Sequence, residues 1–407
     1  MPLQVPGGTP LAGYGSLARR RFFPAVFGGG PAFWFKASTG TLDSLSVRAL
    51  VLEDDAVRLV WVALDVVAVD RPFTERVRTR IGGPEKPATV LLVSASHTHS
   101  GPGAFLESRL MGIVAADRLN RDVREAMLAA VGDAVTRARE RLVPARVGTA
   151  SVQGAPLVKS RLGQPLDVEL VVMKIVSVSG APIALLWNHA IHGTMLGPAN
   201  LAFSGDVMGL ASQALERELG VPALFVNGAL ADVSPGGHGR QAAIATGLEL
   251  ARAVSAAWNR LRAEDSPTLA VRTVPVALPA PSVSLRNCAS RWLPRALRLP
   301  LDGALPGSTE LTAAALGDTV WVTVPGELES RLGLTLKAVA RPTWQHAFVA
   351  GVTNDYLGYF VSAETYDRPG YVTCASLYGR EGGDRITALG SDLLRGLAGL
   401  APGKGVR

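Results

Sequence analysis

Histidines are the residues of this sequence that point most directly to chemistry. The chain has six histidines, and four fall in two short motifs, SASHTHSGPG with His97 and His99, and WNHAIHGT with His189 and His192. Residues two apart on an extended chain point to the same side, so the rings of His97 and His99 can enter one cavity. A catalytic zinc ion typically takes three protein ligands, and two histidines with one carboxylate are a frequent set. The two motifs together predict a metal site, whereas a lone histidine such as His346 is more simply a hydrogen-bonded structural residue.

A serine and a histidine lie close together in a third motif, FVNGALADVSPGGHG, which contains Ser234 and His238. A serine beside a histidine can be the nucleophile of a hydrolase. The motif lacks the G-x-S-x-G pattern, however, and Pro235 opposes the helix that follows the usual nucleophile turn. Two other interpretations stay open: Ser234 is a turn residue, or its hydroxyl lines the metal site as a hydrogen-bond donor.

Short apolar runs precede these motifs and predict the strands that must position them. The strand candidates are Val57–Leu64, Ala88–Ala95, Val168–Ile175, Pro182–Trp187, Ala223–Val226, Thr319–Val324 and Ala347–Val352. Helical spacing predicts a helix after Asp206 and two longer helices. Their apolar faces would carry Val123, Met127, Val131 and Ala134 in one, and Ile244, Leu248, Ala251, Trp258 and Leu261 in the other. We therefore expect a mixed α/β fold of β-sheets layered with flanking helices, built as one large catalytic domain over residues 1–407.

Composition and charge narrow the function classes. The 407 residues carry 41 Lys and Arg against 34 Asp and Glu, which gives a net charge of +7. A basic surface favours anionic partners such as membrane surfaces. No helix-turn-helix, zinc-finger or RNA-binding signature is present, so nucleic acid is not expected as a partner. No apolar run reaches the ~20 residues of a membrane span. The two cysteines, Cys288 and Cys374, allow one disulfide.

Two segments admit more than one interpretation. Residues Arg19–Phe35 combine three arginines, a glycine triplet and several aromatic residues. They form either a lid or lipid-facing loop, as cationic and aromatic interfacial segments do, or an ordinary Gly-rich loop whose rings pack on the core. Pro275–Ser308 is rich in Pro, Leu and Arg without a period, and we expect it to be a long connection within one domain in preference to a linker.

At three motifs the chain resembles the neutral/alkaline ceramidase family. The family blocks SATHTHSGPGG, V-H-x-T-S-M…SGD and GDVSPN correspond here to SASHTHSGPGA, IHGTML…FSGDVMGLAS and ADVSPGG, in the same order. The resemblance continues through VPGELESRLG and YFVSAETYDRPGYVTCASLYG and covers about residues 10–395. It implies four zinc ligands and four residues with catalytic or substrate-positioning roles. The implied ligands are His97, His192, Glu327 and Tyr366, and the implied catalytic residues are Ser234, His99, Tyr378 and Arg161.

The resemblance implies a zinc-dependent amidohydrolase of sphingolipid metabolism. Zinc-activated water would cleave the amide bond of an N-acyl lipid, ceramide first, into a fatty acid and a sphingoid base. His99, Tyr378 and Arg161 would face the oxyanion or the leaving amine, and Ser234 would position the polar head of the substrate or act as nucleophile. Two alternatives stay open: a zinc-dependent amidase or esterase with a non-ceramide substrate, and a non-catalytic lipid-binding homologue.

The sequence departs from the family in ways that concern the substrate more than the metal. The connection around Arg161 is short, the asparagine that precedes this arginine in the family is missing, and Leu42 stands where many relatives have His. Full-length members continue into a C-terminal immunoglobulin-like domain, which residues 1–407 do not contain. The first residues lack a signal-peptide pattern. Relatives are often exported, so we expect a secreted or periplasmic location if further residues precede Met1 in the natural protein.

Overall fold

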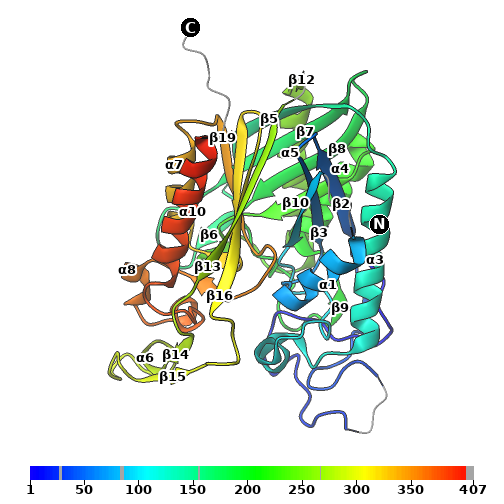
Figure 1. Cartoon of the computed structure of the whole chain (residues 1–407). Helices are drawn as coiled ribbons and strands as arrows, with labels where there is room; N and C mark the ends of the chain where they lie inside the picture. The colour runs from blue at the N-terminus through cyan, green and yellow to red at the C-terminus, as the bar shows by residue number, and fades with distance from the viewer. Residues whose placement is uncertain (27–29, 83–86, 155, 266, 400–407) are drawn as a thin grey trace.

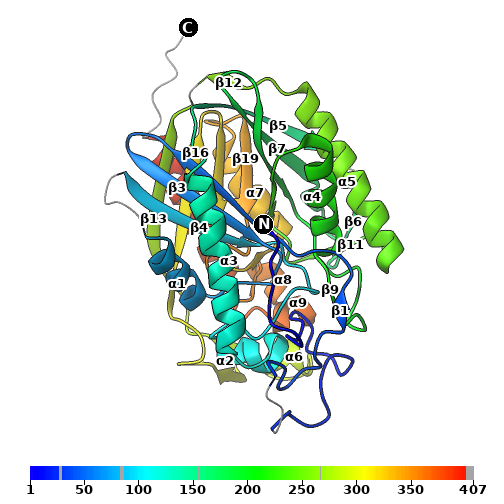
Figure 2. The same cartoon turned by 90° about the vertical axis from the view of Figure 1, so that its right-hand side faces the viewer.

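The computed structural model describes residues 1–26, 30–82, 87–154, 156–265 and 267–399. Within them, three larger β-sheets form two adjoining layers, and helices cover the two outer faces (Figure 1 and Figure 2). This is the mixed α/β arrangement of layered sheets and flanking helices that the sequence predicts. No helix in these ranges is both long and apolar enough to cross a membrane.

The first layer contains a three-stranded and a five-stranded sheet. The three-stranded sheet has the order β2-β3-β4 (Val47–Glu53, Val57–Leu64, Ala88–Ala95), with β2 antiparallel and β4 parallel to β3. The five-stranded sheet has the order β10-β8-β7-β5-β12 (Ala223–Asn227, Pro182–His189, Glu169–Ser177, Ala145–Gln153, Glu264–Asp265). Four helices pack on the outer face: α1 (Arg71–Ile81), α3 (Arg121–Arg139), α4 (Asp206–Leu219) and α5 (Arg240–Arg260).

The second layer is a four-stranded sheet with the order β13-β16-β17-β19 (Leu269–Ala277, Ser308–Leu316, Thr319–Thr323, His346–Ala350). Helices α7 (Ser330–Ala340) and α10 (Gly382–Ala398) cover its outer face. Short elements fill the connections. They are β1 (Gly40–Thr41), α2 (Arg109–Met111), the π-helix η1 (Gly112–Ala116), β6 (Val158–Ser160), β9 (Ala202–Phe203), β11 (Val233–Pro235), β14 (Ser282–Ser284), α6 (Leu285–Cys288), β15 (Arg298–Pro300), β18 (Glu327–Leu328), β20 (Tyr359–Phe360), α8 (Ala363–Tyr366) and α9 (Tyr371–Cys374).

Side chains alternate between two cores along the central strands, as the pleat of a strand requires. On β3, Trp61 faces the space between the sheet layers, whereas Val62 belongs to the core beneath the outer helices. On β17, Trp321 faces the same central space and Val322 packs toward α7 and α10. The rings of Trp61 and Trp321 lie 5.2 Å apart and join the two layers. Because both faces of these strands are buried, their sequences are continuous apolar runs.

The seven predicted strands are present within two residues of their predicted bounds, and the helix after Asp206 is α4. The predicted face of α5 is wrong in part: Leu248 is 40 % exposed, and Leu261 lies beyond the last helical residue. The buried face passes through Gly247 instead, where a Cβ would lie 3.1 Å from the carbonyl oxygen of Val207 on α4. The two helices can approach each other here because glycine is small, so residue size determines this contact more than hydrophobicity does.

The segment Pro275–Ser308 is a connection between neighbouring strands, as predicted, because β13 and β16 are antiparallel partners. It carries β14, α6 and β15 outside the sheet, and β14 pairs with β15. Cys288 in α6 forms a disulfide with Cys374 in α9. The connection is therefore a protruding segment that is cross-linked to the C-terminal part of the chain.

Candidate active site

Three buried side chains from separate segments, two loops and the short strand β18, meet beyond the ends of the longer strands. His97 follows β4, His192 follows β8, and Glu327 follows β17, and each of the three is 1 % exposed. Nε2 of His97 lies 3.3 Å from Oε1 of Glu327, and Nε2 of His192 lies 3.0 Å from Oε2. The ring of His99 is next to them, with its Nε2 3.4 Å from Nε2 of His97. The structure thus brings four of the predicted site residues into one cluster.

Asn227, the last residue of β10, ties the two histidine loops together. Its Nδ2 donates to the carbonyl oxygens of Ser96 at 2.9 Å and Ile191 at 2.8 Å, and its Oδ1 accepts from the N–H of Ile191 at 3.1 Å. Gly193 permits this close approach, because a Cβ there would lie 2.6 Å from Cα of Thr98. The spacing of the two loops is therefore set by buried hydrogen bonds behind the histidine rings.

The surroundings of His97 decide which of its nitrogens faces the cluster. Its Nδ1 lies 2.7 Å from the carbonyl oxygen of Val67, which only accepts, so Nδ1 carries the proton and Nε2 faces Glu327. The φ of His97 is 68°, in the left-handed region that few non-glycine residues adopt. Such conformations concentrate at functional sites, where surrounding contacts hold them in place.

Several polar atoms of the cluster are buried without a hydrogen-bond partner. Both ring nitrogens of His192 and Oε2 of Glu327 are unpaired among the described residues, although His192 Nε2 and Glu327 Oε2 are only 3.0 Å apart. Buried polar atoms are normally paired, so this arrangement fits a group that accepts lone pairs from both sides. The ring nitrogens of His97, His99 and His192 also lie within 4.8 Å of one another, and these three residues could hold a metal ion.

The electrostatics put His192 and Glu327 in the protonation states of metal ligands. Burial, and then the Arg161 guanidinium, lower the pKa of His192 to about 3, so its ring is neutral near pH 7. Burial alone would raise the pKa of Glu327, but His97 and His192 hold it well below its usual range. Neutral imidazoles and an ionised carboxylate are the forms that bind metal ions, and this donor set suits zinc. The residues present therefore fit a metal ion.

Arg161 and Ser234 contact each other on the paired strands β6 and β11 and the turn that follows β6. Nε of Arg161 donates to Oγ of Ser234 at 2.9 Å, and its Nη1 donates to the hydroxyl oxygen of Tyr359 at 3.4 Å. No hydrogen bond joins Ser234 to His238 in the described part of the chain. The described geometry therefore does not support a Ser234 that is paired with a histidine base, because its hydroxyl accepts from Arg161 instead.

The two predicted tyrosines have different surroundings. The hydroxyl of Tyr366 is buried and has no hydrogen-bond partner within the described ranges, and its ring packs in a small cluster with Tyr359, the partner of Arg161. The hydroxyl of Tyr378 donates to the carbonyl oxygen of Pro306 at 2.8 Å, and its ring stacks on Phe360. Tyr366 therefore has a free hydroxyl near the predicted oxyanion residues, whereas the hydroxyl of Tyr378 is occupied by a main-chain partner.

Two further tyrosines touch the cluster, and the sequence motifs did not point to them. The hydroxyl of Tyr356 donates to Oε1 of Glu327 at 2.6 Å. The ring of Tyr14 lies 4.7 Å from that of His99, and Gly13 beside it has a φ of 107° and leaves no room for a Cβ against His99. The only local signal is a tyrosine near a glycine in LAGYG and NDYLGY, and this pattern is common in loops.

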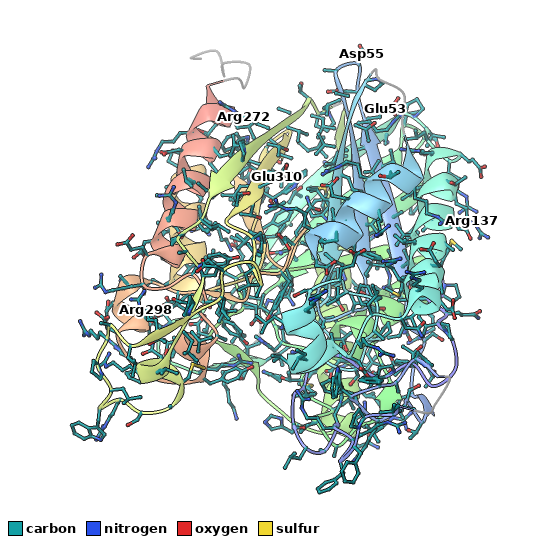
Figure 3. The ribbon with its side chains drawn as sticks, turned by 60° about the horizontal axis from the view of Figure 1, so that its bottom comes forward. Glu53, Asp55, Arg137, Arg272, Arg298 and Glu310 are labelled. Carbon is teal, nitrogen blue, oxygen red and sulfur yellow. A yellow bond between two sulfur atoms is a disulfide. The ribbon has the colours of Figure 1, made fainter. Side chains whose placement is uncertain are left out.

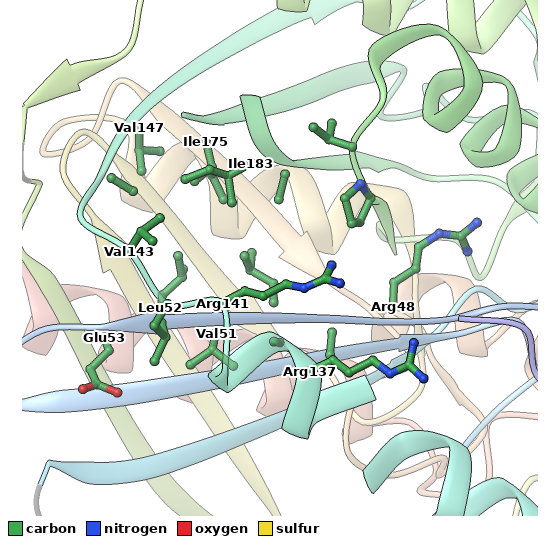
Figure 4. A pocket seen from close by; sticks show the side chains of 18 of the residues that line it. Arg48, Val51, Leu52, Glu53, Arg137, Arg141, Val143, Val147, Ile175 and Ile183 are labelled. Atoms are coloured by element: carbon green, nitrogen blue, oxygen red, sulfur yellow. The ribbon is translucent and has the colours of Figure 1, made fainter. Parts of the chain in front are cut away.

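A cavity of about 920 Å³ lies away from this cluster, along the edge strand β2 (Figure 4). Its wall includes Val51, Ile175, Ile183 and the arginines Arg137 and Arg141. None of the predicted site residues lines it. The candidate site is therefore located by its titratable groups and not by the size of a pocket.

Comparisons with known proteins agree with the motifs. Residues 30–240 match the family model described as neutral/alkaline non-lysosomal ceramidase, N-terminal. The chain is 28% identical over 142 residues to Neutral ceramidase A of Dictyostelium discoideum (31% of this chain, 20% of that protein). It is 26% identical over 186 residues to Neutral ceramidase 1 of Arabidopsis thaliana (41% and 24%), and 26% identical over 198 residues to the neutral ceramidase of Pseudomonas aeruginosa (44% and 29%). The matched part thus spans about a quarter of the length of these curated relatives.

The fold has a close counterpart among solved structures. The crystal structure of neutral ceramidase from Pseudomonas aeruginosa superposes with a TM-score of 0.83, covering 99% of this chain and 74% of that chain. The sequence identity is 18%, so this likeness concerns the fold alone. The family resemblance drawn from the motifs is confirmed.

Proposed function

Because the chain belongs to the neutral/alkaline non-lysosomal ceramidase family, we propose that it is a zinc-dependent hydrolase of N-acyl lipids. It would cleave the amide bond of a substrate such as ceramide to a fatty acid and a sphingoid base. The observation that carries this proposal is the buried cluster of His97, His192 and Glu327, whose ligating atoms face one another while several lack hydrogen-bond partners among the described residues. Buried polar atoms are normally paired, so unpaired nitrogen and oxygen atoms that face one another support a group bound between them.

Four residues are proposed to hold the ion: His97, His192, Glu327 and Tyr366. The role of Glu327 is supported by its two oxygens, each of which lies against one of the histidines. The buried, unpaired hydroxyl of Tyr366 supports its inclusion. A bound zinc ion supplies an acidified water molecule and polarises an acyl carbonyl.

His99 is the proposed proton carrier. Burial, and then the neighbouring histidines His97 and His192, lower its pKa well below the usual range, so the ring is neutral near pH 7. Its Nδ1 has no hydrogen-bond partner among the residues described. That nitrogen faces Gly13, where a Cβ would lie 2.7 Å from it, and Nε2, 3.4 Å from Nε2 of His97, is the nitrogen that faces the cluster. A neutral ring that offers a lone pair at Nε2 can take the proton of the attacking water and return it to the departing amine nitrogen.

Arg161 and Ser234 are proposed to bind the substrate. Arg161 can donate to the oxyanion that develops on the acyl carbon. Arginine only donates hydrogen bonds, so its contact with Ser234 cannot activate the serine as a base would. The contact occupies an acceptor position of Oγ and leaves the serine proton free for the polar head of the substrate. Tyr378 stays a predicted proton donor, and its hydroxyl would have to exchange Pro306 for the leaving amine.

The test combines metal content with turnover on one purified sample. Zinc is measured by mass spectrometry, and release of fatty acid is measured on a fluorescent short-chain ceramide, with and without a chelator. His97→Ala should remove both the zinc and the turnover. His346→Ala is the matched control, because His346 is buried and its Nδ1 lies 2.9 Å from Oγ of Ser151, away from the cluster.

The outcomes separate the alternatives. One zinc per chain with chelator-sensitive release supports both the metal and the substrate class. Zinc without release moves the search to other acyl amides and esters, and no turnover on any of them favours a non-catalytic lipid-binding protein. A wild-type chain without zinc, or a His97→Ala variant that keeps its activity, refutes the zinc hypothesis. We also propose that the protein contacts a membrane surface.

A further inference from the structure

We infer that two protruding segments beside the candidate site form one surface that binds an anionic lipid bilayer. The N-terminal segment comprises residues 14–26 and 30–36, and the β14–β15 segment comprises residues 282–300. The inference deepens the proposed function and rests on it for one reason only, that an N-acyl lipid substrate resides in a bilayer.

The N-terminal segment exposes large aromatic side chains. Phe22 is 94 % exposed and Phe23 is 75 % exposed, and their rings contact each other edge to face. In contrast, Phe35 and Arg19 are buried. In the loop Arg19–Phe35, some rings therefore pack on the core, and others face outward. Residues 27–29 of this loop lie outside the described residues.

The β14–β15 segment has the same character. Trp292 is 81 % exposed and Leu299 is 53 % exposed, and Tyr371 beside the disulfide is 70 % exposed. The segment is held by the β14–β15 pairing and by the disulfide from Cys288 to Cys374. The strand pairing and the disulfide thus hold the segment that carries these exposed apolar side chains in place.

Both segments lie at one end of the molecule, below the sheets in the view of Figure 1 and toward the viewer in Figure 3, where Arg298 is labelled. Most of the large apolar side chains that are exposed in the described ranges belong to these segments or to η1 beside them, which adds Ile113 and Val114. Single exposed apolar side chains are ordinary, but a group of them marks an interaction surface.

The charge of this surface is positive. The sequence of residues 14–36 contains three arginines, of which Arg19 is buried, and one lysine. The sequence of residues 282–300 contains four arginines, and neither segment contains Asp or Glu. Arg21 and Lys36 donate to main-chain carbonyls and not to carboxylates. Arg291 lies over the ring of Trp292, 4.8 Å from its centre. Arg295 is the exception, because its Nη2 lies 3.7 Å from Oδ1 of Asp367. Aromatic side chains interleaved with cations are typical of surfaces that insert at the headgroups of anionic lipids.

The base of the N-terminal segment contacts the candidate site, and the base of the β14–β15 segment contacts the proposed ligand Tyr366. In the N-terminal segment, Tyr14 contacts the ring of His99. Below the β14–β15 segment, Nδ2 of Asn287 donates to the carbonyl oxygen of Tyr366 at 3.0 Å. The topology agrees, because β17 runs antiparallel to β16 and so ends, just before Glu327, at the end of the sheet from which this segment protrudes. A bilayer bound by both segments would face the site.

The test uses the full chain and vesicles that contain no ceramide. Binding is measured by co-sedimentation with vesicles of phosphatidylcholine alone or with one quarter phosphatidylglycerol. The variants Phe22→Ser with Phe23→Ser, and Trp292→Ser, should each weaken binding to the anionic vesicles by about tenfold or more, because each removes large apolar surface from the contact. Arg291→Ala with Arg298→Ala should weaken binding to the anionic vesicles by about fivefold for each arginine. Added salt should also weaken this binding, because it screens the charges.

Leu248→Ser and Val178→Ser are matched controls, since both side chains are exposed and lie outside the two segments. Thermal melting checks that every variant is folded. The inference is supported if only the segment variants lose vesicle binding. It is overturned if the wild type does not bind the anionic vesicles, if it binds neutral vesicles equally well, or if the controls lose as much as the segment variants.

Hydrolysis of a soluble short-chain amide provides a separate readout for the proposed function. Segment variants should keep this hydrolysis while they lose vesicle binding. A protein that binds vesicles but hydrolyses no acyl amide would contradict the proposed function and leave the surface standing.

Discussion

Replacing Asn227 by aspartate should weaken metal binding without removing any ligand. Asn227 is fully buried, and its Nδ2 donates to the carbonyl oxygens of Ser96 and Ile191. These residues directly precede His97 and His192. Aspartate keeps the shape of the side chain and its acceptor oxygen, but it cannot donate. Two buried carbonyl groups then lose this partner, and the spacing of the two histidine loops is no longer fixed.

The expected magnitude follows from the number of lost bonds. A buried polar group left unpaired costs about 1 to 3 kcal/mol, so Asn227→Asp should lower the free energy of unfolding by about 2 to 6 kcal/mol. Residues that orient metal ligands from behind typically change metal affinity by about 10- to 100-fold when they are mutated. The zinc dissociation constant of the variant should rise by that factor.

Asn188→Asp is the matched control. Asn188 is also buried, and its Nδ2 donates to the carbonyl oxygens of Val226 at 2.9 Å and Val349 at 3.0 Å, which join β8 to β10 and β19. Both variants lose two amide donors and gain a buried carboxylate, so their losses in urea unfolding should be similar. Zinc affinity, measured by competition with a fluorescent chelator, should change only for Asn227→Asp. Equal dissociation constants for the two variants would refute the argument that Asn227 positions the histidines.

Three further variants test the surroundings of the site. Tyr356→Phe removes the hydroxyl that donates to Glu327 and should reduce zinc affinity by about tenfold, measured by the same competition titration; an unchanged affinity contradicts this. Cys288→Ser with Cys374→Ser opens a cross-link between residues 86 apart in sequence and should lower stability by about 2 to 4 kcal/mol, so calorimetry should find a lower Tm. Burial raises the pKa of Asp206 to about 6, so the folded chain holds this proton more tightly than the unfolded chain and loses stability as the pH rises from about 4 to 6. Urea unfolding should therefore find that the stability of the wild type relative to Asp206→Asn falls by about 3 kcal/mol between pH 4 and pH 7, and a constant difference would contradict the buried-carboxyl explanation.

The two histidines proposed as ligands were predictable because their signals are local in the sequence. Buried strands appear as apolar runs, and His97 and His192 follow two of these runs in unusual motifs. Glu327 was found only through the family resemblance, since an acidic residue before a helix is ordinary by itself. The strands β13 and β5 were not predicted, because they are partly exposed, contain few large buried side chains and show no apolar run.

The residues that hold the histidines in place could not be predicted, because their contacts join distant parts of the chain. Asn227 reaches Ser96 across 131 residues, and a single asparagine after a strand gives no sign of that partner. Gly193 is required only because the backbone of Thr98 approaches it. Nothing local to either residue encodes these distances, since the packing of the sheet layers brings the segments together.

Whether Tyr366 is a ligand or a core residue can be decided by comparing it with Tyr378. The hydroxyl of Tyr366 is buried without a partner among the described residues, so in metal-free protein Tyr366→Phe leaves nothing unpaired and should keep or slightly raise stability. The hydroxyl of Tyr378 donates to Pro306, so Tyr378→Phe should cost about 0.5 to 1.5 kcal/mol.

With zinc present, Tyr366→Phe should become the less stable of the two variants. An ion that binds only the folded chain raises its Tm, and loss of a ligand should shrink that increase for Tyr366→Phe while Tyr378→Phe keeps it in full. Melting curves of both variants, with zinc and with a chelator, make the comparison. If Tyr366→Phe destabilises the metal-free protein and retains the whole zinc-dependent increase, then Tyr366 serves the core and the metal is held by His97, His192 and Glu327 without it.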